Sequence, residues 1–393
     1  MGKCFFSDSI LNPPKERAAF NIYSIANELE ITGKKVIHME IGKPDFDTPK
    51  IIKDAAIGAL NEGFVHYTEL SGIYDLKKSI VDREEKLYGL KYEPNEVIIT
   101  TGASEGLYSI WTAFLNPTDE IMIPTPHYSG YSQQLSFIGA NIISVPTMKN
   151  NMIKFDISEF HSRLTKNTKM ILINNPCNPT GYVMSNDDLE NIAKFAIDND
   201  LLVVSDECYD NFVYEGKFKS IAELPGMKER TLIVNSTSKT FSMTGWRVGY
   251  VLGNIDYINA INKVHQQITM CATSFAQAGA TIAYRDVYIE VDEMVEEFRK
   301  RREYIIGFLD KIDEISYVSP QGAFYVFANI SKLGISDVDF CEGLLKSKGV
   351  AFTYGSSFGI EFTDYIRISY AVSMDNIIKA MNLMKEYIEE IVK

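Results

Sequence analysis

The most informative stretch of this chain is the run Asn235-Ser236-Thr237-Ser238-Lys239-Thr240-Phe241-Ser242-Met243-Thr244-Gly245-Trp246-Arg247. It follows the apolar segment 231–234, which predicts a buried strand, so the polar residues begin where that strand ends. Small neighbours leave room for Lys239 to form a Schiff base with a carbonyl compound. Hydroxyl groups and the guanidinium of Arg247 can bind a phosphate dianion. The run therefore predicts a site for a phosphorylated aldehyde, with a solvated loop as the alternative.

Alternating apolar and amphipathic segments on both sides of this run predict the fold. Apolar runs that are typical of strands occur at 97–101, 120–123, 141–145, 169–174, 201–205, 231–234 and 248–252. Amphipathic segments between them include 104–114 and 187–199. Short apolar runs between amphipathic helices predict an α/β fold with a largely parallel, covered sheet. In such sheets, ligands bind beyond the carboxyl ends of the strands.

The pattern changes after about residue 285. A charged helix is expected at 291–309, followed by strand-rich sequence and a last helix from Met374. Because a chain of 393 residues exceeds what one hydrophobic core usually organises, two domains are expected. We predict a large α/β domain at 48–285 and a smaller α+β domain made of 1–47 and 286–393.

Composition and charge narrow the class of protein. The chain is 46% hydrophobic and carries a net charge of −13, which argues against nucleic acid as a partner. No apolar run reaches the roughly 18 residues of a membrane span, and the first residues lack the apolar core of a signal peptide. The five cysteines and five histidines are scattered, so reduced thiols and no metal site are expected. These features predict a cytoplasmic enzyme that acts on a small molecule.

A second polar motif joins a predicted strand to a predicted helix: Thr100-Thr101-Gly102-Ala103-Ser104-Glu105-Gly106. Small residues there let backbone N–H groups approach a phosphate at the start of the helix. A plain turn capped by Ser104 is the alternative. The motif lacks the GxGxxG pattern, so a nicotinamide dinucleotide is not indicated.

Two further motifs follow strands, namely Asn174-Asn175-Pro176-Cys177-Asn178-Pro179-Thr180-Gly181 and Val203-Val204-Ser205-Asp206-Glu207-Cys208-Tyr209-Asp210. The first contains two Asn-Pro breaks, so it is either a rigid turn alone or a turn that aims an amide at a ligand. The second brings carboxylates to the end of an apolar strand, where an isolated charge is costly. Such a carboxylate can pair with a basic side chain, or it can face a pyridine nitrogen and keep that ring protonated.

The last motif is Tyr365-Ile366-Arg367-Ile368-Ser369-Tyr370 in the predicted second domain. With Ile366 and Ile368 on one face of a strand, Arg367 points to the other face. Solvent exposure of Arg367 is one interpretation, and a bidentate clamp on a substrate carboxylate is the other.

Taken together, these motifs resemble those of the class I/II, fold-type I aminotransferases, which depend on pyridoxal 5'-phosphate. The resemblance is strongest to aspartate aminotransferase-like enzymes of bacteria and archaea, and it runs from about Val36 to Tyr370. It includes Ile41-Gly42-Lys43-Pro44-Asp45-Phe46-Asp47-Thr48-Pro49 as well as the motifs quoted above. The family has a mostly parallel seven-stranded sheet in its large domain, and the resemblance implies the same here.

The resemblance also implies roles for single residues around the cofactor ring. Lys239 would hold the cofactor as a Schiff base and then move a proton to and from the substrate. Asp206 would pair with the pyridine nitrogen, and Tyr209 and Asn178 would bind the ring hydroxyl. Tyr128 would stack on the ring.

The phosphate and the substrate have their own implied contacts. The phosphate would be held by Ser236, Ser238, Arg247 and the backbone of Ala103 and Ser104. The substrate carboxylate would be held by Gly42, Asn178 and Arg367. In the family, Tyr67 corresponds to a tyrosine that reaches the phosphate of a neighbouring subunit, which implies a homodimer with shared sites. The loop around Thr273 and Ser274 would approach the same neighbour.

Departures from the family pattern bear on the amino donor. Aspartate-preferring members of this subgroup carry a lysine where this chain has Ser104, which weakens an aspartate assignment. Lys43 replaces a common glutamate and offers a substitute cation, and Tyr354 replaces a frequent proline. The segment before Ile25 also fits the family pattern poorly. An aromatic or uncharged amino donor is therefore an open possibility.

Three functions compete at this point. The first is an aminotransferase that passes the α-amino group to a 2-oxo acid, with 2-oxoglutarate expected, by a ping-pong cycle. The second is a C–S β-lyase acting on cysteine conjugates, which the same residues would serve. The third is a catalytically silent binding protein, against which the presence of Lys239 argues. We predict the aminotransferase.

Overall fold

The quoted run begins in strand β9 (Thr231–Ser236) of a seven-stranded sheet. The computed structural model of the protein describes residues 6–11, 13–14, 21–149 and 151–393. Residues 1–5, which include Cys4 and were used above to argue against a signal peptide, lie outside the described part. The strand order is β2-β10-β9-β8-β7-β3-β4. Strand β10 is antiparallel to both of its neighbours, whereas the other adjacent strands run parallel. The predicted α/β fold with a mostly parallel sheet is confirmed.

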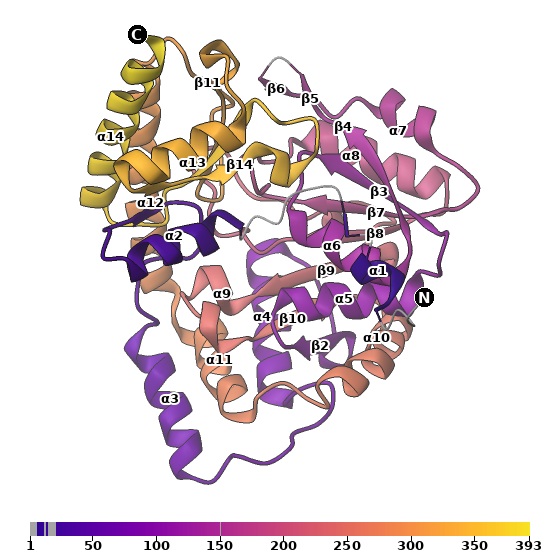
Figure 1. The fold of residues 1–393 in the computed structure, drawn as a ribbon. Coiled ribbons are helices and arrows are strands. Elements are labelled where there is room, and N and C mark those ends of the chain that lie inside the picture. The colour runs from indigo at the N-terminus through magenta and orange to yellow at the C-terminus, as the bar shows by residue number, and fades with distance from the viewer. Residues whose placement is uncertain (1–5, 12, 15–20, 150) are drawn as a thin grey trace, which may run out of the picture.

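Each strand of this sheet coincides with an apolar run of the sequence. The other strands are β2 (Val97–Thr100), β3 (Glu120–Thr125), β4 (Asn141–Pro146), β7 (Thr168–Asn174), β8 (Leu202–Asp206) and β10 (Gly249–Leu252). Neighbouring residues of one strand face opposite sides of the sheet, as Ile98 and Ile99 do by entering different hydrophobic clusters. The two faces therefore both require helices to cover them, as Figure 1 shows.

Helices from both sides supply these covers. One face packs against α5 (Ala103–Phe114), α6 (Ser129–Ile138) and α10 (Ile255–Ile268). The other packs against α3 (Lys50–Asn61), α4 (Tyr74–Tyr88), α7 (Ile157–Arg163), α8 (Asn186–Asp198) and α11 (Ser274–Asp286). The expected helices 104–114 and 187–199 correspond to α5 and α8, each shifted by one residue at its start.

A second, four-stranded antiparallel sheet is built mainly from the C-terminal third of the chain. Its order is β11-β12-β15-β14, made of Ser316–Tyr317, Tyr325–Asn329, Tyr365–Ser369 and Thr353–Tyr354. Beside it, β1 (Ile37–His38) pairs in parallel with β13 (Val350–Ala351). The N-terminal strand β1 therefore lies beside residues that follow it by some three hundred positions in the chain. In Figure 1 the indigo helix that precedes β1 likewise lies beside the C-terminal helices.

The remaining elements surround this second sheet or connect the two. They are α1 (Asp8–Leu11), α2 (Asn21–Ile31), the hairpin strands β5 (Met148–Lys149) and β6 (Met152–Ile153), α9 (Thr237–Thr240), α12 (Tyr288–Leu309), α13 (Asp337–Lys348) and α14 (Met374–Val392). Short 3-10 helices occur at Pro94–Glu96, Ile221–Glu223, Lys228–Arg230, Thr244–Trp246, Ser331–Leu333 and Gly355–Phe358. The charged helix expected at 291–309 is α12, and the helix expected from Met374 is α14.

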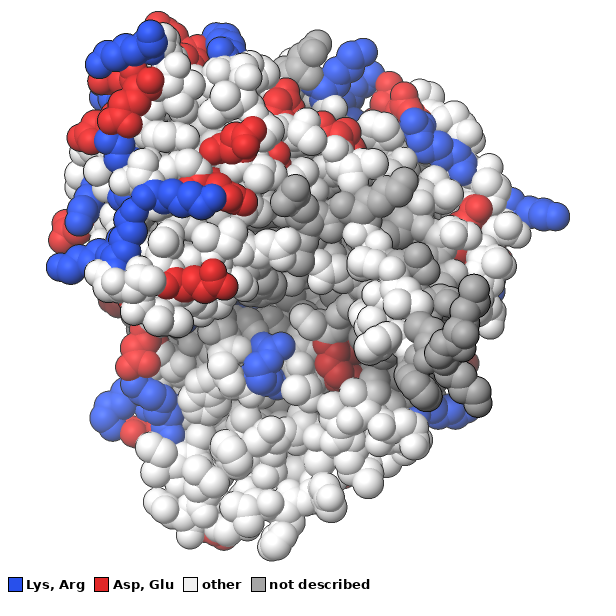
Figure 2. Space-filling view, in the orientation of Figure 1, with Lys and Arg blue, Asp and Glu red and all other residues white. Residues whose placement is uncertain are grey.

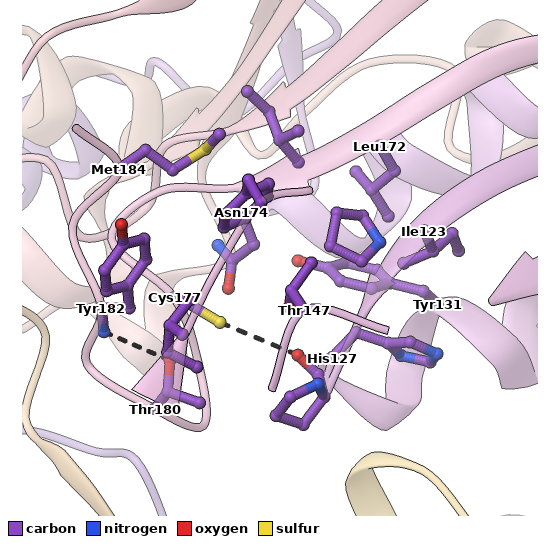
Figure 3. Close-up of a pocket in the computed structure, with 15 residues that line it drawn as sticks. Ile123, His127, Tyr131, Thr147, Leu172, Asn174, Cys177, Thr180, Tyr182 and Met184 are labelled. Carbon is purple, nitrogen blue, oxygen red and sulfur yellow. Dashed lines mark hydrogen bonds between the residues drawn. The ribbon is translucent and has the colours of Figure 1, made fainter. Parts of the chain in front are cut away.

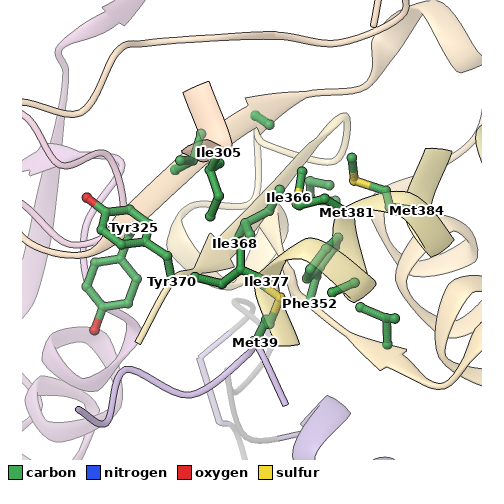
Figure 4. Close-up of a cluster of buried hydrophobic side chains, with 14 of the residues drawn as sticks. Met39, Ile305, Tyr325, Phe352, Ile366, Ile368, Tyr370, Ile377, Met381 and Met384 are labelled. Atoms are coloured by element: carbon green, nitrogen blue, oxygen red, sulfur yellow. The ribbon is translucent and has the colours of Figure 1, made fainter. Parts of the chain in front are cut away.

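A separate hydrophobic core lies under the second sheet. Ile366 and Ile368 of β15 pack there against Met381 of α14 and Met39, which follows β1 (Figure 4). Helix α12 contributes to this core through Phe298 and to the core of the large sheet through Val291, so it joins the two. No helix among the described residues is long and apolar enough to cross a membrane.

Candidate active site

A cavity of about 200 Å³ lies where the carboxyl ends of the large sheet's strands face the second sheet. In Figure 2 a hollow crosses the middle of this face, with basic and acidic side chains along its lower edge. The cavity is lined by residues of all five motifs, among them Gly42, Ala103, Ser104, Tyr128, Asn178, Asp206, Tyr209, Ser236, Ser238, Lys239, Arg247 and Arg367. The tertiary structure thus brings together all but one of the residues predicted to bind cofactor or substrate.

Lys239 lies in the short helix α9, directly after β9, and its ammonium group reaches across the cavity. Its Nζ donates a hydrogen bond of 2.6 Å to the carbonyl oxygen of Gly42. Burial lowers the pKa of Lys239 to about 8, and the guanidinium groups of Arg367 and Arg247 act in the same direction. Roughly a tenth of this amine is therefore neutral at pH 7, far more than for a lysine with an ordinary pKa, and the neutral amine is the nucleophile.

Asp206 ends strand β8 and is buried in the lining of the same cavity. The hydroxyl of Tyr131 donates a 2.6 Å hydrogen bond to Oδ2, and the backbone N–H of Cys208 donates one of 3.2 Å to Oδ1. Burial raises the pKa of Asp206, and these two hydrogen bonds oppose that shift. Within the described part of the chain Asp206 makes no ion pair with a basic side chain, whereas Asp210 of the same motif pairs with Arg83.

The hydroxyl-rich end of the cavity is formed by backbone turns. Ser236 caps α9, since its Oγ accepts a hydrogen bond from the backbone N–H of Ser238. Arg247 adopts a left-handed φ of 55° and lies against Gly102, where any Cβ would collide with its guanidinium. Gly102 also precedes α5, whose first N–H groups have no acceptor within the helix. Hydroxyls, a guanidinium and a helix start together form a site suited to an anion.

Arg367 lies on β15 with its guanidinium in the cavity and is only 4% exposed, so the solvent-exposed alternative is wrong. The face of the second sheet opposite Ile366 and Ile368 meets the large sheet rather than water. Nη1 of Arg367 donates a hydrogen bond of 3.0 Å to Oδ1 of Asn178, and Nη2 of Arg367 donates one of 3.0 Å to Oγ1 of Thr353. Its buried Nε has no hydrogen-bond partner, which leaves one donor free for a carboxylate.

Two tyrosines, Tyr209 and Tyr325, form a chain of contacts that leads to Arg367. The hydroxyls of Tyr209 and Tyr325 lie 2.8 Å apart, and the ring of Tyr325 has its centroid 4.6 Å from the guanidinium carbon of Arg367. A Cβ at position 42 would collide with the hydroxyl of Tyr325, so only glycine fits there. Tyr209 therefore contacts another tyrosine as well as facing the cavity.

A smaller cavity of about 30 Å³ lies behind this site (Figure 3). Tyr131 and Asn174 line both cavities and form the wall between them. Cys177 contributes its thiol there, at 3.9 Å from the carbonyl oxygen of Pro126. This volume has room for only a water or two, so a substrate does not fit there.

Several residues singled out from the sequence lie elsewhere. Tyr67 is 81% exposed on a loop and does not line the cavity of its own chain, and Ser274 donates to the carbonyl oxygen of Phe64 near that loop. Lys43 is exposed and does not line the cavity, and Tyr354 is buried with its hydroxyl 3.4 Å from Glu342. Neither Lys43 nor Tyr354 is placed to select a substrate in this conformation.

Other cavity residues were missed by sequence reasoning, chiefly Tyr131, Tyr325 and Cys208. Tyr131 follows Tyr128 by three positions at the start of α6, a spacing that predicts a shared helix face. Phe327 pairs with Arg367 on the neighbouring strand, so these two side chains face the same side of the second sheet. Tyr325 lies two residues before Phe327 and therefore faces that side too. That pairing is tertiary information and has no signal in the local sequence.

Comparison with known proteins agrees with this geometry. The family model for aminotransferase class I and II matches residues 34–382. The chain is 38% identical to the aspartate aminotransferase of Bacillus subtilis, over 93% of this chain and 94% of that one. It is 35% identical to aromatic-amino-acid aminotransferase 2 of Thermococcus litoralis, over 97% of both chains. The structure of Thermus thermophilus aspartate aminotransferase with maleate superposes with a TM-score of 0.92, 31% identity and coverage of 98% of this chain and 100% of that one.

These relatives are named aminotransferases, so the β-lyase alternative gains no support from them. The family match covers most of the chain and includes the segment that carries Lys239. This protein is an enzyme that belongs to the class I and II aminotransferase family.

Proposed function

We propose that the protein transfers the α-amino group of an amino acid to a 2-oxo acid, with 2-oxoglutarate as the acceptor and pyridoxal 5'-phosphate bound in the 200 Å³ cavity. The cofactor, when bound, supplies an aldehyde that captures amines and a ring that stabilises negative charge. One observation carries the proposal. The amine of Lys239, with its lowered pKa, shares a single cavity with the buried carboxylate of Asp206 and the unpartnered Nε of Arg367.

The residues of the cavity fit this cofactor. Ser236, Ser238, Arg247 and the start of α5 would hold the phosphate, because they form the anion site described above. Asp206 would hold a proton on the pyridine nitrogen, since a buried carboxylate favours a cationic partner. Tyr128 would lie against the ring, and Tyr209 with Asn178 would bind the ring hydroxyl.

The remaining groups would act on the substrate. Arg367 would bind the α-carboxylate through its free Nε–H and orient the α-carbon toward Lys239. Lys239 would take the proton from that carbon and then donate it to the cofactor, because its lowered pKa lets the amine act both as a base and as an acid. The backbone N–H of Gly42 would donate to the same carboxylate, while its carbonyl oxygen accepts from Lys239.

A visible absorption spectrum of the purified protein tests the proposal. We expect a yellow band that bleaches when a donor amino acid is added alone and returns when 2-oxoglutarate is added. The Lys239→Ala variant should remain folded and lose turnover, while Lys263→Ala, an exposed lysine on α10, should behave as wild type. Turnover by Lys239→Ala would refute the assignment, and release of pyruvate and ammonia from a cysteine conjugate would indicate a lyase instead.

For the amino donor we propose an aromatic or uncharged side chain. Among the described residues that line the cavity, the cations are Lys239, Arg247 and Arg367. Each of these already has a role with the cofactor or the α-carboxylate, so no further cation binds an acidic side chain of the donor, and polar groups of the cavity would have to bind the distal carboxylate of 2-oxoglutarate. Ser104 is exposed at the cavity mouth. Replacing it by lysine should lower the KM for aspartate and leave that for phenylalanine unchanged, and a wild type that already prefers aspartate would refute this proposal.

We also propose that the protein works as a homodimer whose two sites are shared. Tyr67 is 81% exposed, and Val65, Ile268 and Met270 are exposed apolar residues of the same region. Figure 2 shows that the lower face of the molecule, which carries the loop after α3 and the segment between α10 and α11 in Figure 1, is nearly free of charge. Such a face favours burial against a second copy. Sedimentation equilibrium tests this, with a monomer as the contrary result.

The division of the chain remains a proposal too. We propose a large domain at 48–285 and a small one at 1–47 and 286–393, supported by the separate hydrophobic cores beneath the two sheets. We further propose a cytoplasmic location, because the four described cysteines are all unpaired. Amide hydrogen exchange compared between the two sheets tests the first of these, and fractionation of cells tests the second.

A further inference from the structure

The exposed Tyr67 is carried by a segment whose backbone is held in place. We call residues 64–73 the Tyr67 loop. The loop leaves α3, passes over the surface and returns to α4. Its ring protrudes, since 81% of Tyr67 is exposed. An aromatic side chain on a surface loop is normally free to move, so the contacts beneath this loop need a reason.

The main contact beneath the loop is the side chain of Gln277, which is fully buried in α11. Its Oε1 accepts a 2.9 Å hydrogen bond from the backbone N–H of Ile73. Its Nε2 donates to Oγ1 of Thr68 at 3.1 Å and to the carbonyl oxygen of Ala272 at 2.8 Å. One amide thus joins both halves of the loop to the start of α11.

Two further contacts hold the ends of the same loop. Ser274, also in α11, donates to the carbonyl oxygen of Phe64 at 3.0 Å. The backbone N–H of Ile99, in the edge strand β2, donates to the carbonyl oxygen of Ser71 at 2.9 Å. The loop is therefore fixed at both ends, and Gln277 fixes it at Thr68, the residue next to Tyr67.

Burying a primary amide is costly unless its polar groups find partners, and a glutamine loses side-chain entropy on burial. Gln277 makes three hydrogen bonds, and two of them go to the Tyr67 loop. A group that is held in its binding geometry before association loses less entropy when it binds. The arrangement suits a tyrosine whose partner lies outside its own chain.

We infer that Gln277 is a positioning residue that presets Tyr67 for the phosphate site of the neighbouring subunit, and thus acts on that subunit's site rather than on its own. The inference rests on the proposed homodimer with shared sites. Gln277 itself does not line the cavity, so its effect on cofactor binding passes through Thr68 and Tyr67.

The first test is cofactor affinity, measured by titrating the cofactor-free protein with pyridoxal phosphate and following the visible band. Gln277→Met keeps the side-chain length and removes the three hydrogen bonds of the amide. The dissociation constant of the cofactor should then rise about tenfold, which is the effect expected when the charge-assisted hydrogen bond from Tyr67 to the phosphate is lost. Thr68→Val, which removes only the loop acceptor, should raise it less. Ile110→Val, a change in the core on the opposite face of the sheet from Ile73, should leave it unchanged despite a similar loss of stability.

A double variant separates positioning from general weakening of the fold. Tyr67→Phe removes the hydroxyl that Gln277 is inferred to place. If Gln277 acts through that hydroxyl, Tyr67→Phe with Gln277→Met should bind the cofactor no more weakly than the weaker single variant. Additive losses would overturn the inference, because they would mean that Gln277 affects the site by another route.

A hybrid dimer tests the action between subunits. We combine a Lys239→Ala subunit with a Gln277→Met subunit, each carrying its own affinity tag. The one remaining lysine-bearing site then receives its Tyr67 from the Lys239→Ala subunit, which has an intact Gln277. We expect wild-type cofactor affinity and half the wild-type activity per dimer. If the hybrid instead shows the raised dissociation constant of the Gln277→Met homodimer, the inference is overturned.

These outcomes are distinct from failure of the proposed function. A wild-type monomer by sedimentation would remove the homodimer proposal and this inference with it. A wild-type protein without a visible band would remove the cofactor proposal. A yellow wild-type dimer with an unaltered Gln277→Met variant would overturn only the role of Gln277.

Discussion

The hydroxyl of Tyr131 donates a 2.6 Å hydrogen bond to the buried carboxylate of Asp206. Tyr131 comes from α6 and Asp206 from the end of β8, so the bond connects a covering helix to the carboxyl edge of the sheet. It stabilises the charged form of a carboxylate whose pKa burial raises. The charge on which the proposed function depends is therefore maintained by a residue outside the sequence motifs.

Replacing Tyr131 by phenylalanine should move the acid side of the activity profile to higher pH. Loss of the hydrogen bond raises the pKa of Asp206 further, so the carboxylate becomes protonated at a higher pH than in wild type. We expect a shift of about one pH unit, which corresponds to roughly 1.4 kcal/mol. The measurement is kcat/KM against pH. Tyr250→Phe removes a comparable buried hydrogen bond, to Glu84, and should leave the profile unchanged. An unshifted profile for Tyr131→Phe would mean that the bond does not control this charge.

Replacing Arg367 by lysine should weaken substrate binding much more than it slows turnover. Lysine keeps the positive charge but loses the planar fork and the free Nε–H. We expect the KM for the amino donor to rise about a hundredfold, equivalent to roughly 2.7 kcal/mol, with a smaller change in kcat. Steady-state kinetics with one donor test this. Arg302→Lys alters a buried arginine that contacts Ser319 and Glu215 instead, and its KM should stay at the wild-type value.

The pKa of Lys239 predicts how fast the cofactor-free protein captures pyridoxal phosphate at different pH. Only the neutral amine attacks an aldehyde, and its fraction grows until the pH passes the pKa. Because burial lowers that pKa to about 8 from the ordinary 10.5, the rate should rise toward pH 8 and then level off. Stopped-flow absorbance follows the reaction. A rate that still climbs well beyond pH 9 would show that Lys239 keeps an ordinary pKa.

A buried ion cluster beneath the site predicts a large loss of stability. Arg83 donates to Asp210 at 2.5 Å and to Glu84 at 2.8 Å, and Asp210 directly follows Tyr209. Arg83→Met would leave two buried carboxylates without their cation and should cost about 3–5 kcal/mol of unfolding free energy. Urea unfolding at one protein concentration measures this. Lys194→Ala breaks the exposed pair with Asp198 and should leave the midpoint almost unchanged.

The sequence predicted well those features that depend on local pattern. Every apolar run assigned as a strand of the large sheet is one, because strands covered on both faces are apolar, and the more exposed edge strand β4 still carries Ile142, Ile143 and Val145. The polar motifs follow these strands, and their residues line one cavity, because parallel strands end at a common edge. The roles that the family resemblance assigns to Lys239, Asp206 and Arg367 stay predictions that the experiments above address.

Tertiary contacts decided the rest. The orientation of Arg367 was open in the sequence because alternation assigns a side chain to a face of a strand without saying what covers that face. Tyr131 and Tyr325 come from separate elements, and only packing places one on Asp206 and the other on Arg367. Likewise, Gln277 reads as an ordinary helix residue until α11 packs beneath the Tyr67 loop. Local sequence determines which elements form, whereas burial of distant elements against each other determines the partners of each polar group.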